Sequence, residues 1–298
     1  MAEWVDLLDP SEGELRGALP VEAHAVALRQ LLAKPEKGQE PRPRLDSHGD
    51  YVFGVLIAAV SKQGALVYQE IDVLLTDSVL LTVRKTPPGN EPFEPHEARK
   101  ACKDTDHASL FLYHLVDHVA EGYLDLIEDL VGDIDRIEDS IDAEGTAGVR
   151  RELTSLRHEA LHVRRVLGPT RDAVHKIVDG RLDLEGVDLF TGDVQLHFAD
   201  AYDKLLRATE SLDLLRDLVA GIRDYAQAKV ANDQNEVMKR LTAIASILLL
   251  PTFIVGLYGQ NFAVIPELHW SQGYGFSWGL IIVTTLVQLW YFRKKRWI

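Results

Sequence analysis

The stretch Leu257-Tyr258-Gly259-Gln260-Asn261-Phe262 decides the fold, because it lies between two apolar segments near the end of the chain. The first segment spans residues 241–258 and the second spans residues 276–292, and neither contains a charged side chain. Each is near the lower end of the roughly 17–25 apolar residues that a helix needs to cross a bilayer. The alternative is a pair of core helices in a soluble protein, since such helices can also lack charge.

The charges around these segments favour a membrane hairpin. Lys239 and Arg240 precede the first segment, basic residues at 293–296 follow the second, and the loop at 259–275 has no Lys or Arg. This asymmetry predicts that both ends face the cytoplasm. Aromatic side chains suited to membrane interfaces stand near the segment ends: Trp270, Tyr274, Trp278, Trp290, Tyr291 and Trp297. We therefore interpret 241–258 and 276–292 as transmembrane helices, 259–275 as an extracytoplasmic loop and 293–298 as a basic cytoplasmic tail.

The composition predicts a large cytoplasmic part. The formal net charge is −14, which disfavours nucleic acid and favours cations as partners. Cys102 is the single cysteine, so an internal disulfide is excluded and a reducing compartment is expected. The first residues lack a basic and an apolar region, so we expect no cleavable signal. The sequence also offers no nucleophile motif, phosphate loop or cysteine pair, and an enzyme is not expected.

Residues 1–115 are interpreted as a cytoplasmic α/β domain. Apolar runs at 51–60, 65–75 and 79–83 are separated by short turn-forming segments. Connections this short predict antiparallel neighbours in one sheet. The segment 35–43 is rich in Pro, Glu and Lys and is expected to be an exposed loop.

Two further cytoplasmic parts are expected to be helical. Residues 116–190 are interpreted as an acidic helical hairpin, with a turn near residues 144–145 and a break or kink at Gly168-Pro169. Residues 191–240 are interpreted as a stalk helix, beginning near Gly192 and continuing into the first membrane segment. If unbroken to Tyr258, this helix is roughly 100 Å long.

The first membrane segment has one face suited to a pore. Leu241, Leu249 and Thr252 recur at helical spacing, together with small residues at 245, 256 and 259. Small residues also permit close packing of helices, and this alternative stays open. Two spans cannot enclose an aqueous path, so transport requires several copies of the chain.

Several motifs together resemble the CorA family of divalent-cation channels. They are Asn235-Glu236-Val237-Met238-Lys239, the run at 250–253, Tyr258-Gly259-Gln260-Asn261-Phe262, Pro266-Glu267-Leu268 and the basic end. The resemblance implies an α+β cytoplasmic domain, a stalk helix and two C-terminal transmembrane helices. It also implies a funnel-shaped homopentamer in the inner membrane, with the first spans lining the pore. The implied partners are other copies of the chain, membrane lipids and the transported cation, and no resident cofactor is implied.

The resemblance also implies which residues meet the ion. The filter falls on Gly259, Gln260 and Asn261, and the pore-lining positions fall on Asn235, Leu241, Leu249 and Thr252. Mg²⁺ loses its water reluctantly, so amide and hydroxyl oxygens that contact its hydration shell suit a pore. Leucine rings suit a gate that excludes water. Glu267, the acid of the loop, is expected to attract cations at the outer mouth, or else to be a solvated or bracing carboxylate.

This chain departs from the family pattern at two places. The usual Gly-Met-Asn has Gln260 in its middle, which leaves the choice among Mg²⁺, Co²⁺, Ni²⁺ and Zn²⁺ open. Pro251 is also displaced by one position, so the kink in the first span is expected to differ. Well-studied members hold a regulatory Mg²⁺ between two aspartates of neighbouring subunits. Asp200, with Asp203 nearby, matches one of them, whereas Ser61-Lys62-Gln63 has no carboxylate to match the other.

The sequence also raises the possibility of zinc binding by histidines and more than one function for the chain. His114 and His118, and likewise His158 and His162, are four residues apart, but neither pair has a visible third ligand for zinc. The expected function is a divalent cation channel, with Mg²⁺ as the first choice. The alternatives are a zinc transporter of the ZntB type, which could be coupled to protons, and a membrane-anchored sensor or scaffold that does not conduct.

Overall fold

The computed structural model describes residues 2–36, 38–62, 65–143, 146–261, 265 and 269–298. The chain divides into two compact units, residues 1–223 and residues 224–298. The longest helix, α6 (Gly192–Tyr258), contributes its first part to one unit and its remainder to the other.

The first unit is built on a five-stranded sheet with the order β1-β5-β4-β3-β2. β3 (Val52–Lys62), β4 (Ala65–Leu75) and β5 (Val79–Arg84) form the antiparallel centre, which confirms the expectation from their short connections. Two strands were not predicted. β1 (Glu3–Leu8) pairs in parallel with β5, and β2 (Arg44–Ser47) pairs antiparallel with β3.

Glycine permits the close approach of β2 to β3. Gly54 is paired with Leu45, and a Cβ atom at Gly54 would lie 2.3 Å from the Leu45 side chain and 2.7 Å from the Arg44 carbonyl oxygen. No side chain fits at those distances, so a residue without Cβ is needed at this point of the sheet.

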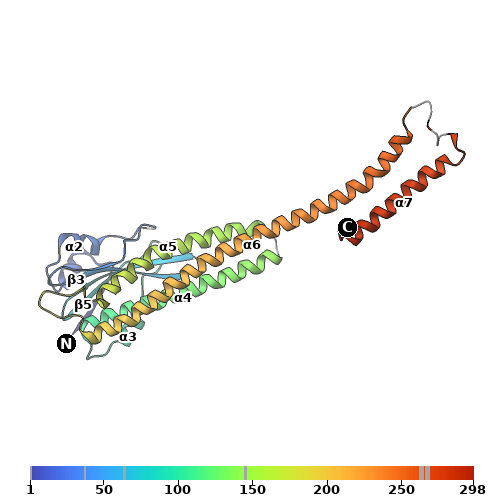
Figure 1. Ribbon diagram of the computed structural model, residues 1–298. Helices are drawn as coiled ribbons and strands as arrows, with labels where there is room; N and C mark the ends of the chain where they lie inside the picture. The colour runs from blue at the N-terminus through green and yellow to red at the C-terminus, as the bar shows by residue number, and fades with distance from the viewer. Residues whose placement is uncertain (1, 37, 63–64, 144–145, 262–264, 266–268) are drawn as a thin grey trace. The chain divides into compact units, whose positions relative to one another are not determined.

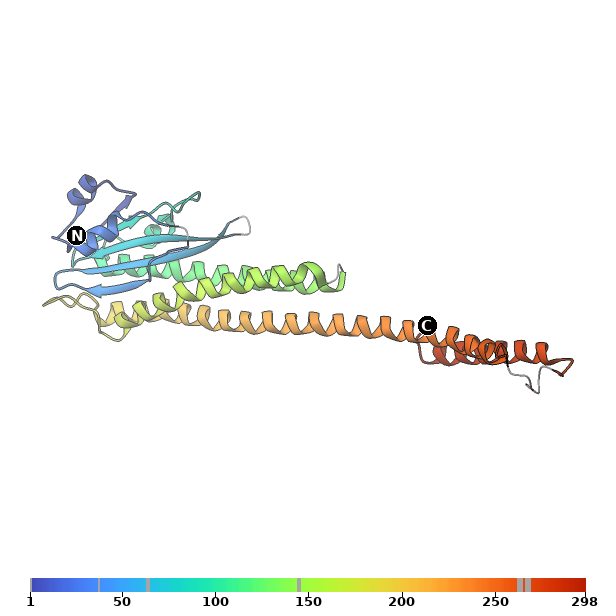
Figure 2. The ribbon, with the colours of Figure 1, turned by 90° about the horizontal axis from the view of Figure 1, so that it is seen from above.

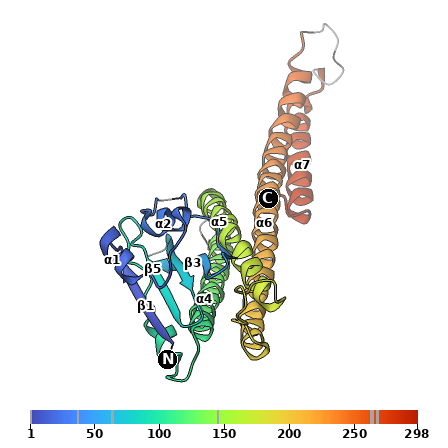
Figure 3. The same ribbon diagram turned by 90° about the vertical axis from the view of Figure 1, so that its left-hand side faces the viewer.

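Helices cover both faces of the sheet (Figure 3). On one face α4 (Ala108–Ala143) packs against the strands, and its Phe111 ring lies 6.2 Å from that of Trp4 in β1. Tyr123 of α4 is fully buried and donates its hydroxyl proton to the Ile57 carbonyl of β3 at 2.6 Å. On the other face α2 (Ala25–Leu32) is held by Gln30, whose amide donates to Glu70 of β4. Two short helices, α1 (Glu12–Ala18) and α3 (His96–Ala101), complete this part.

α4, α5 (Thr146–Val178) and the first part of α6 lie side by side (Figure 1). Lys204 of α6 bonds to Asp117 and Glu121 of α4, and Arg164 of α5 bonds to Asp213 of α6 at 2.9 Å. A break or kink was expected at Gly168-Pro169; the break is wrong, because α5 continues through Pro169. Buried residues stand on both sides of the proline, and this packing stabilises the helix despite the lost hydrogen bond. The turn expected at 144–145 lies outside the described residues.

Candidate functional site

The second unit contains two exposed apolar helices, the end of α6 and α7 (Gly273–Lys294), which lie alongside each other (Figure 2). Their most apolar stretches have mean hydropathies of 2.1 and 1.4, and only 11% and 6% of these stretches are buried. A core helix of a soluble protein would be mostly buried. Within the described residues, these are the two helices with the length and composition to cross a membrane.

One face of α6 packs against α7. Ala243 and Ile254 are buried, and the partly buried residues at 246, 247, 250, 251 and 258 complete the same stripe at helical spacing. The matching stripe on α7 ends at Phe292, which is also buried. The two stripes of reduced exposure therefore mark the sides on which the helices face each other, and the Gln288 side chain of α7 bonds to the Ser246 carbonyl of α6 there.

The opposite face of α6 carries the residues expected to line a pore. At about 100° per residue, Leu241, Leu249 and Thr252 point away from the α7 contact, together with the small residues Ala245 and Gly256. Leu241 is 58% exposed and Leu249 is 70% exposed. Asn235, lower on the same helix, is exposed as well. A single chain thus leaves this face without a protein partner in the described structure, and its pore-lining role stays a prediction.

The hydroxyl of Thr252 has a defined orientation. It donates its proton to the Leu248 carbonyl of the preceding turn at 2.8 Å. The oxygen lone pairs of Thr252 therefore remain available as acceptors on the exposed face. Water molecules bound to a cation are donors, so this arrangement suits contact with a hydrated ion.

The three residues of the expected filter follow the end of α6. The helix ends at Tyr258, and the Gly259 amide donates to the Val255 carbonyl at 2.9 Å. Gln260 and Asn261 come next and are exposed. Glu267, expected at the outer mouth, lies outside the described residues.

The candidate regulatory position on the stalk is already next to a positive charge. The Asp200 carboxylate lies 3.7 Å from Lys204, and Asp203 is exposed. Lys62, near the expected partner position, forms an ion pair with Glu91. Among the described residues, no group of three or more His, Cys, Asp or Glu side chains is arranged to hold a metal. Neither aspartate is therefore part of a formed metal site within one described chain.

The histidine pairs do not act as pairs in this fold. His114 lies 3.4 Å from Asp106, whereas the neighbouring His118 packs against the Phe93 ring. His162 bonds to Glu40 at 2.9 Å and lies against Tyr68, with ring centroids 4.2 Å apart. His114, His118 and His162 thus contact side chains of the first unit, whereas His158 is exposed.

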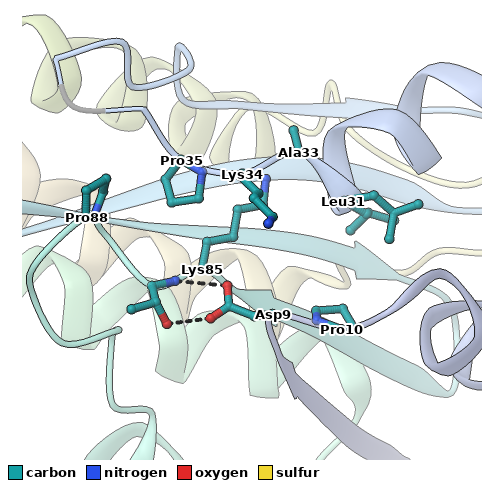
Figure 4. A pocket seen from close by; sticks show the side chains of 10 residues that line it. Asp9, Pro10, Leu31, Ala33, Lys34, Pro35, Lys85 and Pro88 are labelled. Atoms are coloured by element: carbon teal, nitrogen blue, oxygen red, sulfur yellow. Dashed lines mark hydrogen bonds between the residues drawn. The ribbon is translucent and has the colours of Figure 1, made fainter.

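A pocket in the first unit is lined in part by Lys85, which belongs to a buried charge cluster that was not predicted from the sequence (Figure 4). Its volume is about 460 Å³, and Asp9, Lys34 and Lys85 are among its lining residues. Lys85 is 2% exposed and forms ion pairs with Glu70 and, at 2.7 Å, with Asp72.

Burial is most costly for Asp72 in this cluster, because its carboxyl group is fully shielded from water. Its burial raises its pKa to about 7, and the nearby Glu70 carboxylate adds to the rise while Lys85 opposes it. The Lys85 ammonium also donates to the Gln30 carbonyl of α2 at 2.7 Å. The cluster therefore fastens α2 to the sheet, and it offers no free ligand set for a metal.

Comparisons with known proteins agree with the order of elements along the chain. Residues 2–294 match the family model described as CorA-like Mg²⁺ transporter protein. The cobalt/magnesium transport protein CorA of Thermotoga maritima is 27% identical over 92% of this chain and 77% of its own length. A zinc transport protein ZntB of Yersinia enterocolitica is 24% identical over 88% of this chain and 78% of its length. The solved structure of the CorA magnesium transporter from Methanocaldococcus jannaschii superposes with a TM-score of 0.77 at 20% identity, covering 99% of this chain and 91% of that one.

Proposed function

Because this chain belongs to the CorA-like Mg²⁺ transporter family, we propose that it passes hydrated Mg²⁺ through a pore formed by five copies of itself. Members of this family are ion transporters rather than enzymes, and the chain is accordingly a divalent cation transporter. The choice of Mg²⁺, the passive mode of transport and the five-fold assembly belong to the proposal.

The main support for this proposal is the difference between the two faces of α6. One face is covered by α7 of the same chain, and the opposite face bears Leu241, Leu249 and Thr252 with high exposure. In a ring of copies, α7 would lie outside toward lipid and this opposite face would point to the shared axis. The outward residues of α7, such as Ile282, Val283 and Leu286, are bulky, apolar and exposed, as lipid contact requires.

Each proposed ring has a distinct chemical task. Asn261 carbonyl oxygens at the mouth accept hydrogen bonds from the waters around the ion, so the ion is held weakly enough to leave again. Farther along the pore, the Thr252 hydroxyl oxygen accepts hydrogen bonds from the same waters. Leu249 and Leu241 form constrictions that close by excluding water. Asn235 forms a polar ring at the cytoplasmic end.

The proposed location is the inner membrane, with both termini in the cytoplasm. Lys239 and Arg240 flank one helix and Arg293 to Arg296 flank the other, while the described part of the connecting loop lacks basic residues. The acidic first unit would then face the cytoplasm.

Mg²⁺ uptake into vesicles tests the proposal. Purified protein is reconstituted into liposomes that contain a Mg²⁺-sensitive dye, and uptake is compared with that of Asn261→Ala. We expect the variant to be about tenfold slower, because a ring of amide acceptors is lost. Gln272→Ala is the matched control, since Gln272 is an exposed amide just before α7 and outside the motif. Normal uptake by a folded, oligomeric Asn261→Ala protein would refute the role of Asn261.

Zinc transport is the second candidate, favoured by the ZntB relative and by Gln260 in place of the usual Met. The same vesicles, tested with Mg²⁺, Co²⁺, Ni²⁺ and Zn²⁺ with and without a pH gradient, separate the two. Zinc uptake that rises with a proton gradient would replace the Mg²⁺ proposal. A wild-type protein that is monomeric or dimeric and moves none of these ions would instead support a membrane-anchored sensor or scaffold.

A further inference from the structure

Gln288 makes a side-chain hydrogen bond between the two membrane helices. It lies in the apolar helix α7, and its Nε2 donates to the Ser246 carbonyl of α6 at 3.1 Å. The opposite orientation of the amide would place two oxygens against each other, so the chemistry of the contact fixes the donor. Ser246 itself takes no part through its hydroxyl, which donates to the Thr242 carbonyl.

The Gln288 bond meets α6 close to the point where its backbone hydrogen bonding is interrupted. Pro251 has no N–H, so the Ile247 carbonyl loses its usual partner within the helix. Ser246 is the residue just before that carbonyl, and Leu249 and Thr252 follow within two turns. Gln288 therefore holds the backbone at the beginning of the segment that bears two of the proposed pore residues.

The energetics argue against a role in stability alone. A hydrogen bond between membrane helices contributes little net stability. Gln288 also buries its Oε1 without a hydrogen-bond partner among the described residues, and this loss is larger than what the bond contributes. An apolar side chain of the same length would avoid that loss and fill the same space.

We propose that Gln288 is a positioning residue for conduction, which fixes the rotation of α6 beside Pro251 and thereby the placement of Leu249 and Thr252. This inference rests on the proposed transport function. It assigns no contact between Gln288 and the ion, because Gln288 faces α6 from the side opposite the proposed pore.

Gln288→Met tests the inference, because methionine keeps the length and packing and removes the donor. The matched control is Thr284→Val, since the Thr284 hydroxyl donates only to carbonyls of its own helix, at Leu280 and Ile281. We expect the maximal Mg²⁺ flux of Gln288→Met to fall about threefold, with an unchanged half-saturating concentration because Asn261 at the mouth is unaltered. Thr284→Val is expected to match the wild type.

Hydrogen exchange of the full-length protein in detergent supplies a second readout. In Gln288→Met, the amides of residues 250 and 252–254 are expected to exchange about threefold faster than in wild type and in Thr284→Val. Unchanged exchange and unchanged flux in a conducting protein would overturn the inference and leave the proposed function intact. A fall in flux without faster exchange would also overturn it, since the backbone would not have been released. Loss of flux in the wild type would instead count against the proposed function itself.

Discussion

Replacing Asp72 by Asn should change how the stability of the first unit depends on pH. Asp72 is fully buried beside Lys85 and Glu70, and its burial raises its pKa to about 7. In the unfolded chain the carboxyl returns to its ordinary value of 3.8. The folded state therefore binds the proton more tightly, and stability is greatest at low pH and falls as the pH rises toward 7.

The size of the effect follows from the two pKa values. Between about pH 5 and about pH 8 the wild type should lose about 3 kcal/mol of unfolding free energy from Asp72 alone. Asn cannot ionise, so this component disappears in Asp72→Asn. The variant should resemble the wild type near pH 5, apart from a constant offset for its altered bond to Lys85. It should then gain about 3 kcal/mol relative to the wild type near pH 8.

Urea unfolding of the full-length protein in detergent measures this difference. Trp4 reports on the sheet, because its indole N–H donates to Thr82 of β5 at 3.0 Å. Asp46→Asn is the control, since Asp46 is a half-exposed carboxylate in β2 that is paired with Lys176. Its curves are expected to shift equally at both pH values. If Asp72→Asn and wild type lose stability in parallel from pH 5 to pH 8, the reasoning from the buried carboxyl is refuted.

Three further predictions concern packing and gating. Gly54→Ala should lower the unfolding free energy by about 2–3 kcal/mol, because the added Cβ has no room beside β2; an unchanged urea midpoint would contradict this. Tyr123→Phe should cost about 1–2 kcal/mol in the same assay, because the Ile57 carbonyl loses a buried donor, and no loss would show that the bond is not formed. Leu249→Asn should raise resting Mg²⁺ leak into vesicles about threefold or more by wetting the constriction. Ile244→Asn should not, because Ile244 is exposed but lies about 140° from Leu249 around α6; equal leak in both variants would exclude a gate at Leu249.

The membrane hairpin and the long helix could be predicted because their signals are local. Uncharged runs, flanking basic residues and apolar residues at helical spacing are all contained in neighbouring positions of the chain. The central strands were predictable for the same reason. β1 was not, because the mixed sequence Glu3–Leu8 becomes a strand only by pairing with β5, more than seventy residues away. The continuation of α5 through Pro169 likewise depends on tertiary packing, which outweighs the local effect of proline.

In the candidate site too, local features could be predicted and tertiary contacts could not. That Leu241, Leu249 and Thr252 share one face of the helix could be predicted from their spacing, and the structure adds that this face lies opposite α7. The contact of Gln288 could not be predicted, because its acceptor is a backbone carbonyl and leaves no trace in a side-chain pattern. The cluster of Asp72, Glu70 and Lys85 could not be predicted from the sequence for a related reason. A charged residue within an apolar strand indicates a buried partner without saying which one.

The back-bonded hydroxyls of the membrane helices have a consequence for the assembly of subunits. Thr242, Ser246, Thr252 and Thr284 each return their proton to a carbonyl of their own helix. These four hydroxyl donors are therefore satisfied within a single hairpin and need no second subunit to pair with them in an apolar surrounding.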